Sequence, residues 1–558
     1  MLRNAPVRIA LCFALLLCLG TKLAKLSAQQ APAEIPGITI RTNTRLVMVD
    51  VVVRDKKGQA VLGLKPEDFA VEENGKKQKV ATFTPPGANQ TASESPPPGI
   101  LSNHPNVLKP VGVPTVLLLD ATNSHFVDQS YGRMQMLKYV LEQWQAGKPM
   151  AVMTLTDRLH VLQNFTGDPK ILMDAIKNLR PQEMILQGGS SPAPASIAND
   201  GAGLGGGASA SMAITQAELA SFASLETGYV MERRTMITIQ ALRDLARMLS
   251  GFSGRKNVVW LTADFPFDLI PADRNISDAE LMAELPSVRQ KSVETIAAGS
   301  LAREQRMLHG EEIKLAEASL ASAGIAIYPV DMRGIMVSGI DVNSTFALQE
   351  LAAETGGKAY TNQNDIKQGI ALAVADEDSS YSLGYYPENK KWDGKFRNIK
   401  VKVARGDTEI RYRRGYFAVD PTLDKNWKPD QEVASAFQMS GPATQVSFMA
   451  QVKATDPGKA RVVFLVNAHT LSAEESSGGK KMTMSLYAAV YNSSGKNLGV
   501  RATKVDRTFD AATYKQIIDK GMMVPLDIDT PSEGKEVRLV VLDNKTGLIG
   551  TVRGALTH

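Results

Sequence analysis

Apolar and polar positions alternate in short runs near the beginning of the chain, a pattern that is typical of strands. The runs lie at Leu46–Val53 and Phe69–Glu72, and the Asn74–Gly75 pair that follows is a common hairpin turn. We therefore expect an N-terminal β module over residues 36–85. Residues 86–111 mix proline, serine, glycine and asparagine with few apolar residues, which predicts a linker.

The pattern changes over residues 112–378, where short apolar strands alternate with segments of helical periodicity. Predicted strands lie at Val116–Leu119, Ala151–Leu155, His160–Leu162, Asn257–Leu261 and Ile325–Val330. Predicted helices cover residues 131–145, a segment opened by Asp168 and Pro169, residues 235–249 and residues 278–323. This alternation predicts an α/β domain with a doubly wound, mostly parallel sheet.

The first of these predicted helices carries apolar residues at helical spacing. We expect them to form its buried face, and they are Met134, Leu137, Val140, Leu141 and Trp144.

A glycine-, alanine- and serine-rich stretch at residues 187–211 interrupts the α/β pattern, and we expect it to be a mobile insertion. Its glycines, concentrated at Gly201–Gly207, could also suggest a phosphate-binding loop. No Gly-Lys-Ser/Thr follows them, however, and no strand directly precedes them, so the composition favours the flexible insert.

Strand character returns after residue 378. We expect a β extension over residues 379–418, which contains the apolar and aromatic runs Tyr381–Tyr386 and Arg411–Phe417. Residues 430–558 then alternate apolar and polar positions in several runs that are separated by turns such as Asn492–Gly495. A C-terminal β-sandwich of immunoglobulin-like type fits this pattern.

The first 28 residues have the pattern of a signal peptide. Arg3 and Arg8 precede an apolar run at Ile9–Leu19, and Ala28 ends a small-residue cleavage site. We therefore expect an exported protein that is periplasmic, on the cell surface or secreted. A lipid anchor on Cys18 is the alternative, although a leucine occupies the preceding position, and no later run is apolar enough for a permanent membrane span.

Charge and cysteine usage narrow the function classes further. The chain has 63 basic and 58 acidic residues. The expected signal removes four basic residues and no acidic residue, so 59 basic residues remain against 58 acidic ones. This balance leaves no electrostatic footprint for nucleic acid. Both cysteines, Cys12 and Cys18, lie in the expected signal, so we expect neither a disulfide nor a reactive thiol in the mature chain.

A polar loop follows the first strand of the predicted α/β domain, where open α/β sheets bind ligands. It reads Asp120-Ala-Thr122-Asn-Ser124 and resembles the Asp-x-Ser-x-Ser loop of von Willebrand factor A domains. The resemblance implies a metal-ion-dependent adhesion site, in which the Thr122 and Ser124 hydroxyls ligate Mg²⁺ and Asp120 supports it. Oxygen ligands suit this ion. Without a metal, Asp120 and Ser124 would only cap the following turn.

The resemblance extends beyond this loop to the VWFA-related proteins described from Acidobacteria, and it covers most of Ile38 to Phe417. It leaves the C-terminal sandwich outside. The segments that carry it are Glu67–Gly75, Val152–Asp157, Val161–Asp168, Gly254–Thr262, Tyr328–Asp331, Glu354–Gly357 and Tyr381–Pro387.

The sequence departs from the family's complete metal site at two places. Ser190, within the insert, is the candidate for a threonine from a Gly-Gly-Thr-like loop. Ala263 occupies the position of an expected aspartate, and Asp264 is displaced from it by one residue. The metal residues implied are therefore Asp120, Thr122 and Ser124, with Ser190 and Asp264 as weaker members. A working Mg²⁺ site and a degenerate remnant both remain open.

The sequence does not contain a complete catalytic motif that would support an enzyme. The histidines lack zinc-ligand spacing, and Ser253–Lys256 and Lys545–Gly547 match fragments of a serine acyltransferase without its Ser-Asp-Asn motif. The run Asp376–Asp378 is expected to be a solvated helix end. Asp331 follows another sheet strand and could line the same cleft as Asp120, but a cap on the Met332–Gly334 turn is the favoured interpretation.

We therefore predict a non-enzymatic, exported protein that binds one or more protein partners through its A-like domain. If Mg²⁺ binds, the resemblance implies that an acidic side chain of the partner completes its coordination. The alternative is a metal-free structural or assembly component of the cell envelope.

Overall fold

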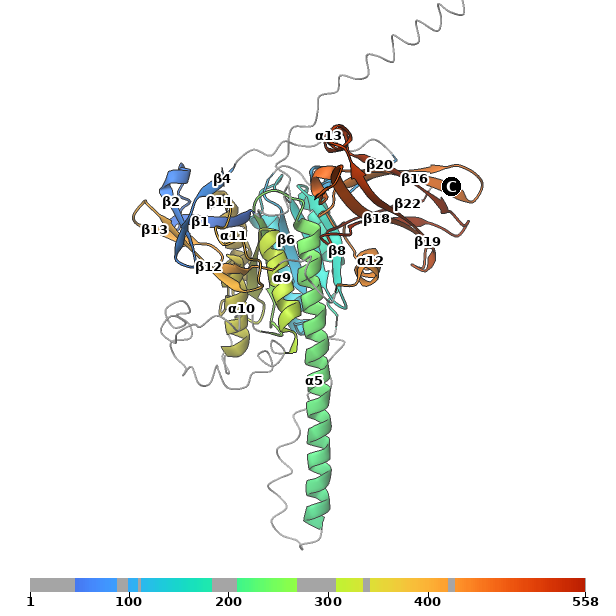
Figure 1. The fold of residues 1–558 in the computed structure, drawn as a ribbon. Helices are drawn as coiled ribbons and strands as arrows, with labels where there is room; N and C mark the ends of the chain where they lie inside the picture. Colours follow the sequence, from blue (N-terminus) through green and yellow to red (C-terminus); the bar gives the residue numbers. More distant parts are fainter. Residues whose placement is uncertain are drawn as a thin grey trace, which may run out of the picture. The chain divides into compact units, whose positions relative to one another are not determined.

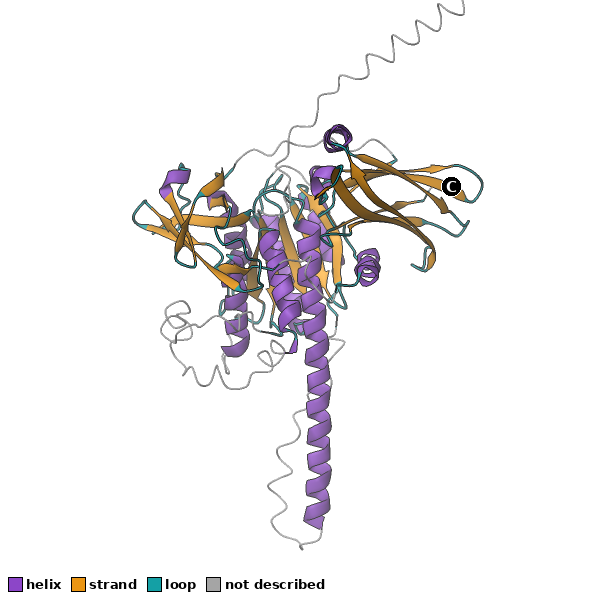
Figure 2. Ribbon diagram, viewed as in Figure 1, coloured by secondary structure: helices purple, strands orange, loops and turns teal. Residues whose placement is uncertain are grey.

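The computed structural model describes residues 46–87, 99–108, 112–182, 208–267, 308–334, 342–419 and 427–556. The expected signal peptide and Ser190 lie outside these residues. The described residues form a mixed α/β structure (Figures 1 and 2). Backbone hydrogen bonds join its strands into one parallel-containing sheet and several antiparallel sheets. In the part of the chain that is described, no helix is long and apolar enough to cross a membrane.

The parallel-containing sheet has five strands, and β6 lies at its centre. Four strands are parallel, whereas β8 runs antiparallel to β7. Only residues 156–158 connect β7 to β8, and such a short connection permits a hairpin but no parallel crossover. Across the sheet the strands are β10 (Ile325–Asp331), β9 (Lys256–Thr262), β6 (Thr115–Asp120), β7 (Met150–Leu155) and β8 (Leu159–Thr166).

Helices cover both faces of this sheet. Successive side chains of β6 point to opposite faces, so each face packs against its own group of helices. Leu117 and Leu119 pack with one group of helices, and Val116 and Leu118 pack with the other. The first group is α3 (Phe126–Glu142), α4 (Pro169–Asn178) and α11 (Ile366–Ala375). The second is α5 (Ala208–Leu249), α9 (Gly310–Ser322) and α10 (Val342–Thr355), of which α5 and α9 pass over β6 in Figure 1.

The predicted buried face of α3 is partly wrong. Met134 and Leu141 are exposed, whereas Met136 and Tyr139 are buried. The reason is a close approach at Gly132, where an added Cβ would lie 2.2 Å from the Met332 sulfur. This glycine lets the helix backbone approach the end of β10, and the contact fixes which side of the helix faces the sheet.

The predicted starts of two other helices can be compared with the structure. The Asp168 carboxylate accepts a hydrogen bond from the Lys170 backbone N–H (2.8 Å), so the predicted cap of α4 is confirmed. The predicted insertion over residues 187–211 is wrong at its end, because α5 begins at Ala208. Most of the insertion, and residues 278–307 of the long predicted helix, lie outside the described residues.

The predicted N-terminal β module and β extension are not separate, since their strands alternate within two sheets and share one core. Short hairpins bury too little apolar surface to be stable alone, which explains the interleaving. One sheet has the order β13 (Thr408–Arg411), β1 (Val47–Asp55), β11 (Ser380–Tyr385), β4 (Val80–Thr84). The other has the order β14 (Gly415–Phe417), β12 (Phe396–Val403), β2 (Phe69–Glu73), β3 (Lys76–Gln78), with a 3-10 turn at Pro66–Asp68 before β2.

Two further antiparallel sheets share a core over the C-terminal part of the chain. One has the order β20 (Met522–Asp529), β16 (Lys459–Val466), β15 (Phe448–Ala454), β5 (Ile100–Ser102). The other contains β17 (Glu474–Ser476), β18 (Gly479–Tyr491), β21 (Glu536–Asp543) and β22 (Ile549–Ala555), with β19 (Asn497–Phe509) paired to β18. Short helices accompany these sheets at α2 (Pro105–Leu108), α12 (Pro429–Gln438), Ala468–Thr470 and α13 (Ala511–Lys520).

The predicted linker over residues 86–111 is therefore wrong where it contains β5. The buried Asn103 holds this strand in place, because its amide nitrogen donates to the backbone oxygens of Ala443 (2.7 Å) and Val446 (2.8 Å). Its amide oxygen accepts from the Phe448 N–H (2.8 Å). An asparagine with partners on both sides of its amide fixes the register of a short edge strand.

Asp376 is another correction. It is buried at the start of the turn Asp376–Ser379, where a solvated helix end was expected. Its carboxylate accepts from Arg54 Nε (3.0 Å) and Arg411 Nη2 (2.7 Å). Arg54 lies on β1 and Arg411 on β13, so this buried carboxylate ties the end of α11 to the interleaved β strands.

Candidate functional site

Asp120 ends the central strand of the five-stranded sheet, and its carboxylate is fully buried. Oδ1 accepts from the Asn123 backbone N–H (2.9 Å). Oδ2 accepts from the Asn123 amide (2.9 Å), the Trp260 indole N–H (2.9 Å) and the Thr262 hydroxyl (3.1 Å). The two last donors lie on β9, the strand next to β6, so the polar cluster at the end of the sheet is built from two adjacent strands.

The surroundings of Asp120 act on its ionisation in opposite directions. Burial raises the pKa of the Asp120 carboxyl above its ordinary value, while the hydrogen bonds from Asn123, Trp260 and Thr262 work against this rise. A buried carboxylate with three N–H donors is well paired, and the Thr262 hydroxyl proton is shared between it and the Asp264 backbone oxygen (2.7 Å). The arrangement therefore explains how a charged group is accommodated at the centre of the sheet.

The other two predicted loop residues are buried beside Asp120. The Thr122 hydroxyl donates to the Thr156 backbone oxygen, and the Ser124 hydroxyl oxygen accepts from the Ala263 N–H (2.9 Å). The buried Gln129 of α3 ties the loop to the helix by donating to the Ser124 backbone oxygen (2.9 Å). The structure thus brings Asp120, Thr122 and Ser124 together, with both hydroxyls engaged in hydrogen bonds to the backbone of neighbouring loops.

Arg234 on α5 is one residue of this site to which no sequence pattern points. Its Nε donates to the Asn123 side-chain oxygen (2.9 Å), and its Nη2 donates to Asp264 Oδ2 (2.8 Å). The other Asp264 oxygen accepts from the Phe265 N–H (2.8 Å). Nothing in the sequence distinguishes Arg234 from its neighbour Arg233, because only the fold places one of the two against the loop.

The residues present do not fit a bound Mg²⁺. The Asp264 carboxylate is paired with Arg234 and accepts from the Phe265 backbone N–H. The resemblance assigns direct ligation to the Thr122 and Ser124 hydroxyls, so the misfit lies in the guanidinium of Arg234, whose positive charge beside the loop repels a divalent cation. The predicted Asp264 ligand thus binds an arginine in this structure, and Ser190 lies outside the described residues.

Asp331 has the role that the sequence favoured. Its Oδ1 accepts from the Arg333 backbone N–H (2.9 Å), and its Oδ2 accepts from Arg333 Nη2 (2.8 Å). This is the hydrogen-bond pattern of a carboxylate that caps a turn. The turn-capping interpretation of Asp331 is therefore confirmed.

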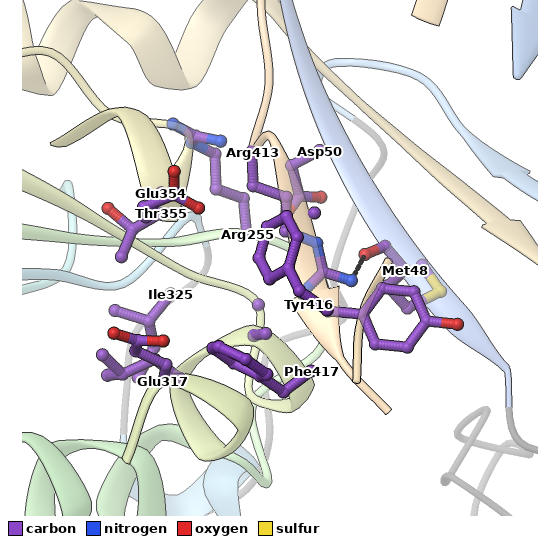
Figure 3. A pocket seen from close by; sticks show the side chains of 15 residues that line it. Met48, Asp50, Arg255, Glu317, Ile325, Glu354, Thr355, Arg413, Tyr416 and Phe417 are labelled. Atoms are coloured by element: carbon purple, nitrogen blue, oxygen red, sulfur yellow. Dashed lines mark hydrogen bonds between the residues drawn. The ribbon is translucent and has the colours of Figure 1, made fainter. Parts of the chain in front are cut away.

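A separate pocket lies where β1 and β14 approach α9 and α10 (Figure 3). Two buried arginines help to line it, and each is held by other groups. Arg413 donates to the Met48 backbone oxygen (2.7 Å), and Arg255 donates to the Tyr328 hydroxyl (2.8 Å). Burial lowers the pKa of the Arg413 guanidinium. Neither the Asp120–Ser124 loop nor Asp264 lines this pocket, so it is distinct from the site at the end of β6.

The fold and the loop thus define a mixed α/β protein with a buried polar cluster at the carboxyl end of its parallel strands. No family model matches the chain, and no curated protein matches it. Its neighbours among solved structures include von Willebrand factor A domains.

One such neighbour is the vWF domain of the type V pili tip protein Mfa5 from Porphyromonas gingivalis, with 11% identity over 48% of this chain and 96% of that chain, at a TM-score of 0.24. Another is a von Willebrand factor type A protein from Catenulispora acidiphila, with 9% identity over 92% and 74% of the two chains and a TM-score of 0.22. An aerotolerance-related membrane protein from Bacteroides fragilis matches at 11% identity over 48% and 98%, with a TM-score of 0.23.

Proposed function

We propose that the chain is an exported, non-enzymatic protein that binds a protein partner with the face at the carboxyl end of its parallel strands. The observation that carries the proposal is the contrast at the end of the loop. Asp120 to Ser124 are buried and hydrogen-bonded, and the next residues include Phe126 and Val127, which are 49% and 74% exposed. Export is the expectation drawn from the amino-terminal sequence.

Aromatic side chains, phenylalanine among them, are enriched at the centres of protein interfaces. Phe126 and Val127 begin α3, and this end of the helix is fixed by Gln129, which hydrogen-bonds to the loop. A partner that covers these two side chains would bury apolar surface without first ordering the backbone that presents them. A metal ion has no part in this proposal.

The experiment compares proteins retained from cell-envelope extracts by the immobilised full chain and by two variants. The test variant carries Phe126→Asp and Val127→Asp. The control is Leu141→Asp, which places a carboxylate at a 65% exposed position near the other end of the same helix. We expect the test variant to lose about tenfold or more of the retained partner, which corresponds to about 1.4 kcal/mol or more. The control should retain it.

Two outcomes decide against the proposal. Equal retention by the test variant and the control would remove this face from the interface and favour the alternative, a structural component of the envelope. Retention by the wild type that disappears in EDTA and returns with Mg²⁺ would make the interaction metal-dependent, contrary to the donors found around Asp120 and Asp264.

A further inference from the structure

Arg234 stands at the loop where the resemblance implies a divalent cation. We infer that its guanidinium replaces this cation as the fixed positive charge of the site, and that it recognises a carboxylate of the partner without metal. This inference rests on the proposed function and specifies its chemistry. The arginine links the Asn123 side chain in the loop to Asp264, which follows β9.

Two of the three guanidinium nitrogens of Arg234 hold the side chain in place, and the third makes no hydrogen bond with a described residue. A guanidinium has five N–H donors, and two nitrogens of Arg234, Nε and Nη2, make the hydrogen bonds to Asn123 and Asp264. Among the described residues, Nη1 has no acceptor and is not one of the fully buried polar atoms that lack a partner. The Arg234 side chain is 11% exposed.

A guanidinium fixed by two hydrogen bonds suits carboxylate recognition for two physical reasons. Its planar donors form charge-assisted hydrogen bonds with carboxylate oxygens. In addition, the side chain is already ordered before the partner arrives, so binding costs less rotamer entropy than at a free surface arginine. Asp264 neutralises part of the charge, as acidic residues do around a bound cation, and leaves N–H donors for a second carboxylate.

Arg233 provides a matched control for Arg234. The two arginines are adjacent on α5, but Arg233 is exposed and has no hydrogen bond or ion pair among the described residues. Arg233→Gln and Arg234→Gln remove the same charge and introduce the same side chain. Any difference between the two variants therefore reports the placement of Arg234 and not the net charge of the protein.

The test uses two probes on the full chain, succinate and MnCl₂, at constant ionic strength. Succinate binding is followed by calorimetry, and Mn²⁺ binding is followed by loss of the electron paramagnetic resonance signal of the free ion. We expect wild type and Arg233→Gln to bind succinate with the same affinity and Arg234→Gln to bind at least tenfold more weakly. We expect no saturable Mn²⁺ binding that depends on the loop. Circular dichroism verifies that each variant is folded.

Two results would overturn the inference. One is equal succinate affinity of the two glutamine variants, or the absence of binding to wild type. The other is saturable Mn²⁺ binding to wild type that the loop variant Thr122→Val abolishes. Both readouts are independent of the partner experiment, where failure of the Phe126 and Val127 variant to lose the partner would refute the proposed function alone.

Discussion

The hydrogen bond from Trp260 to Asp120 offers a test of how the buried loop is stabilised. Trp260 is fully buried on β9, and its indole N–H lies 2.9 Å from Asp120 Oδ2. Trp260→Phe keeps an aromatic ring but removes this donor. The carboxylate then has one fewer partner in a site that water does not reach, and hydrogen bonds to buried charged groups contribute about 1.5–3 kcal/mol.

Trp144 is the matched control for this substitution. It is 9% exposed, and its indole nitrogen is buried without a hydrogen-bond partner among the described residues. Trp144→Phe therefore removes the same atoms from the same α/β region but breaks no hydrogen bond. The loss of packing is common to both variants, so the difference between them isolates the hydrogen bond to Asp120.

The assay is urea unfolding of the full chain, followed by far-ultraviolet circular dichroism and by fluorescence. We expect Trp260→Phe to lower the free energy of unfolding by about 1.5–3 kcal/mol more than Trp144→Phe. Losses that agree within about 0.5 kcal/mol would show that the indole N–H contributes nothing to the stability of the charged loop.

Two further predictions concern the buried carboxylates. Burial raises the pKa of the Asp120 carboxyl, so protonation of this group stabilises the folded state. This contribution to the free energy of unfolding is fully present below the unfolded pKa of about 3.9 and is lost as the pH rises through the folded pKa. The unfolding free energy of wild type relative to Asp120→Asn, measured by urea unfolding from pH 3.5 to 8, should therefore fall with rising pH, and a rise would contradict the assigned shift. Asp376→Asn breaks the contacts to Arg54 and Arg411, and we expect it to lower the free energy of unfolding by about 3–5 kcal/mol in the same assay. The control is the exposed Asp378→Asn, which should lower it by less than about 1 kcal/mol. Equal losses would show that the contacts of Asp376 are not stabilising.

The sequence predicted those features that depend on local pattern. The apolar run Val116–Leu119 and the polar residues after it placed a buried strand and its loop, because strand burial and loop polarity are visible over a few residues. The cap at Asp168 was predictable for the same reason, since a capping aspartate and a proline at the first helical position are adjacent in sequence.

The features that the sequence did not predict depend on contacts between distant segments. Val49 pairs with Leu383, and no local pattern specifies such a partner. Ile100–Ser102 is too short to be recognised as a strand before β15 is placed beside it. The same holds for Arg234 and Asn123, which lie 111 residues apart, so that the cationic character of the site appears only in the folded chain.

Arg234 and the hydrogen-bond donors around Asp120 are expected to hold the Asp120–Ser124 loop without a metal ion. The most direct test measures the thermal unfolding midpoint of the full chain after dialysis against EDTA and again in excess Mg²⁺. We expect the same midpoint in both conditions and a lower midpoint for Arg234→Gln in each. A wild-type midpoint that Mg²⁺ raises, together with a Thr122→Val variant that shows no such rise, would show instead that a metal ion stabilises the loop.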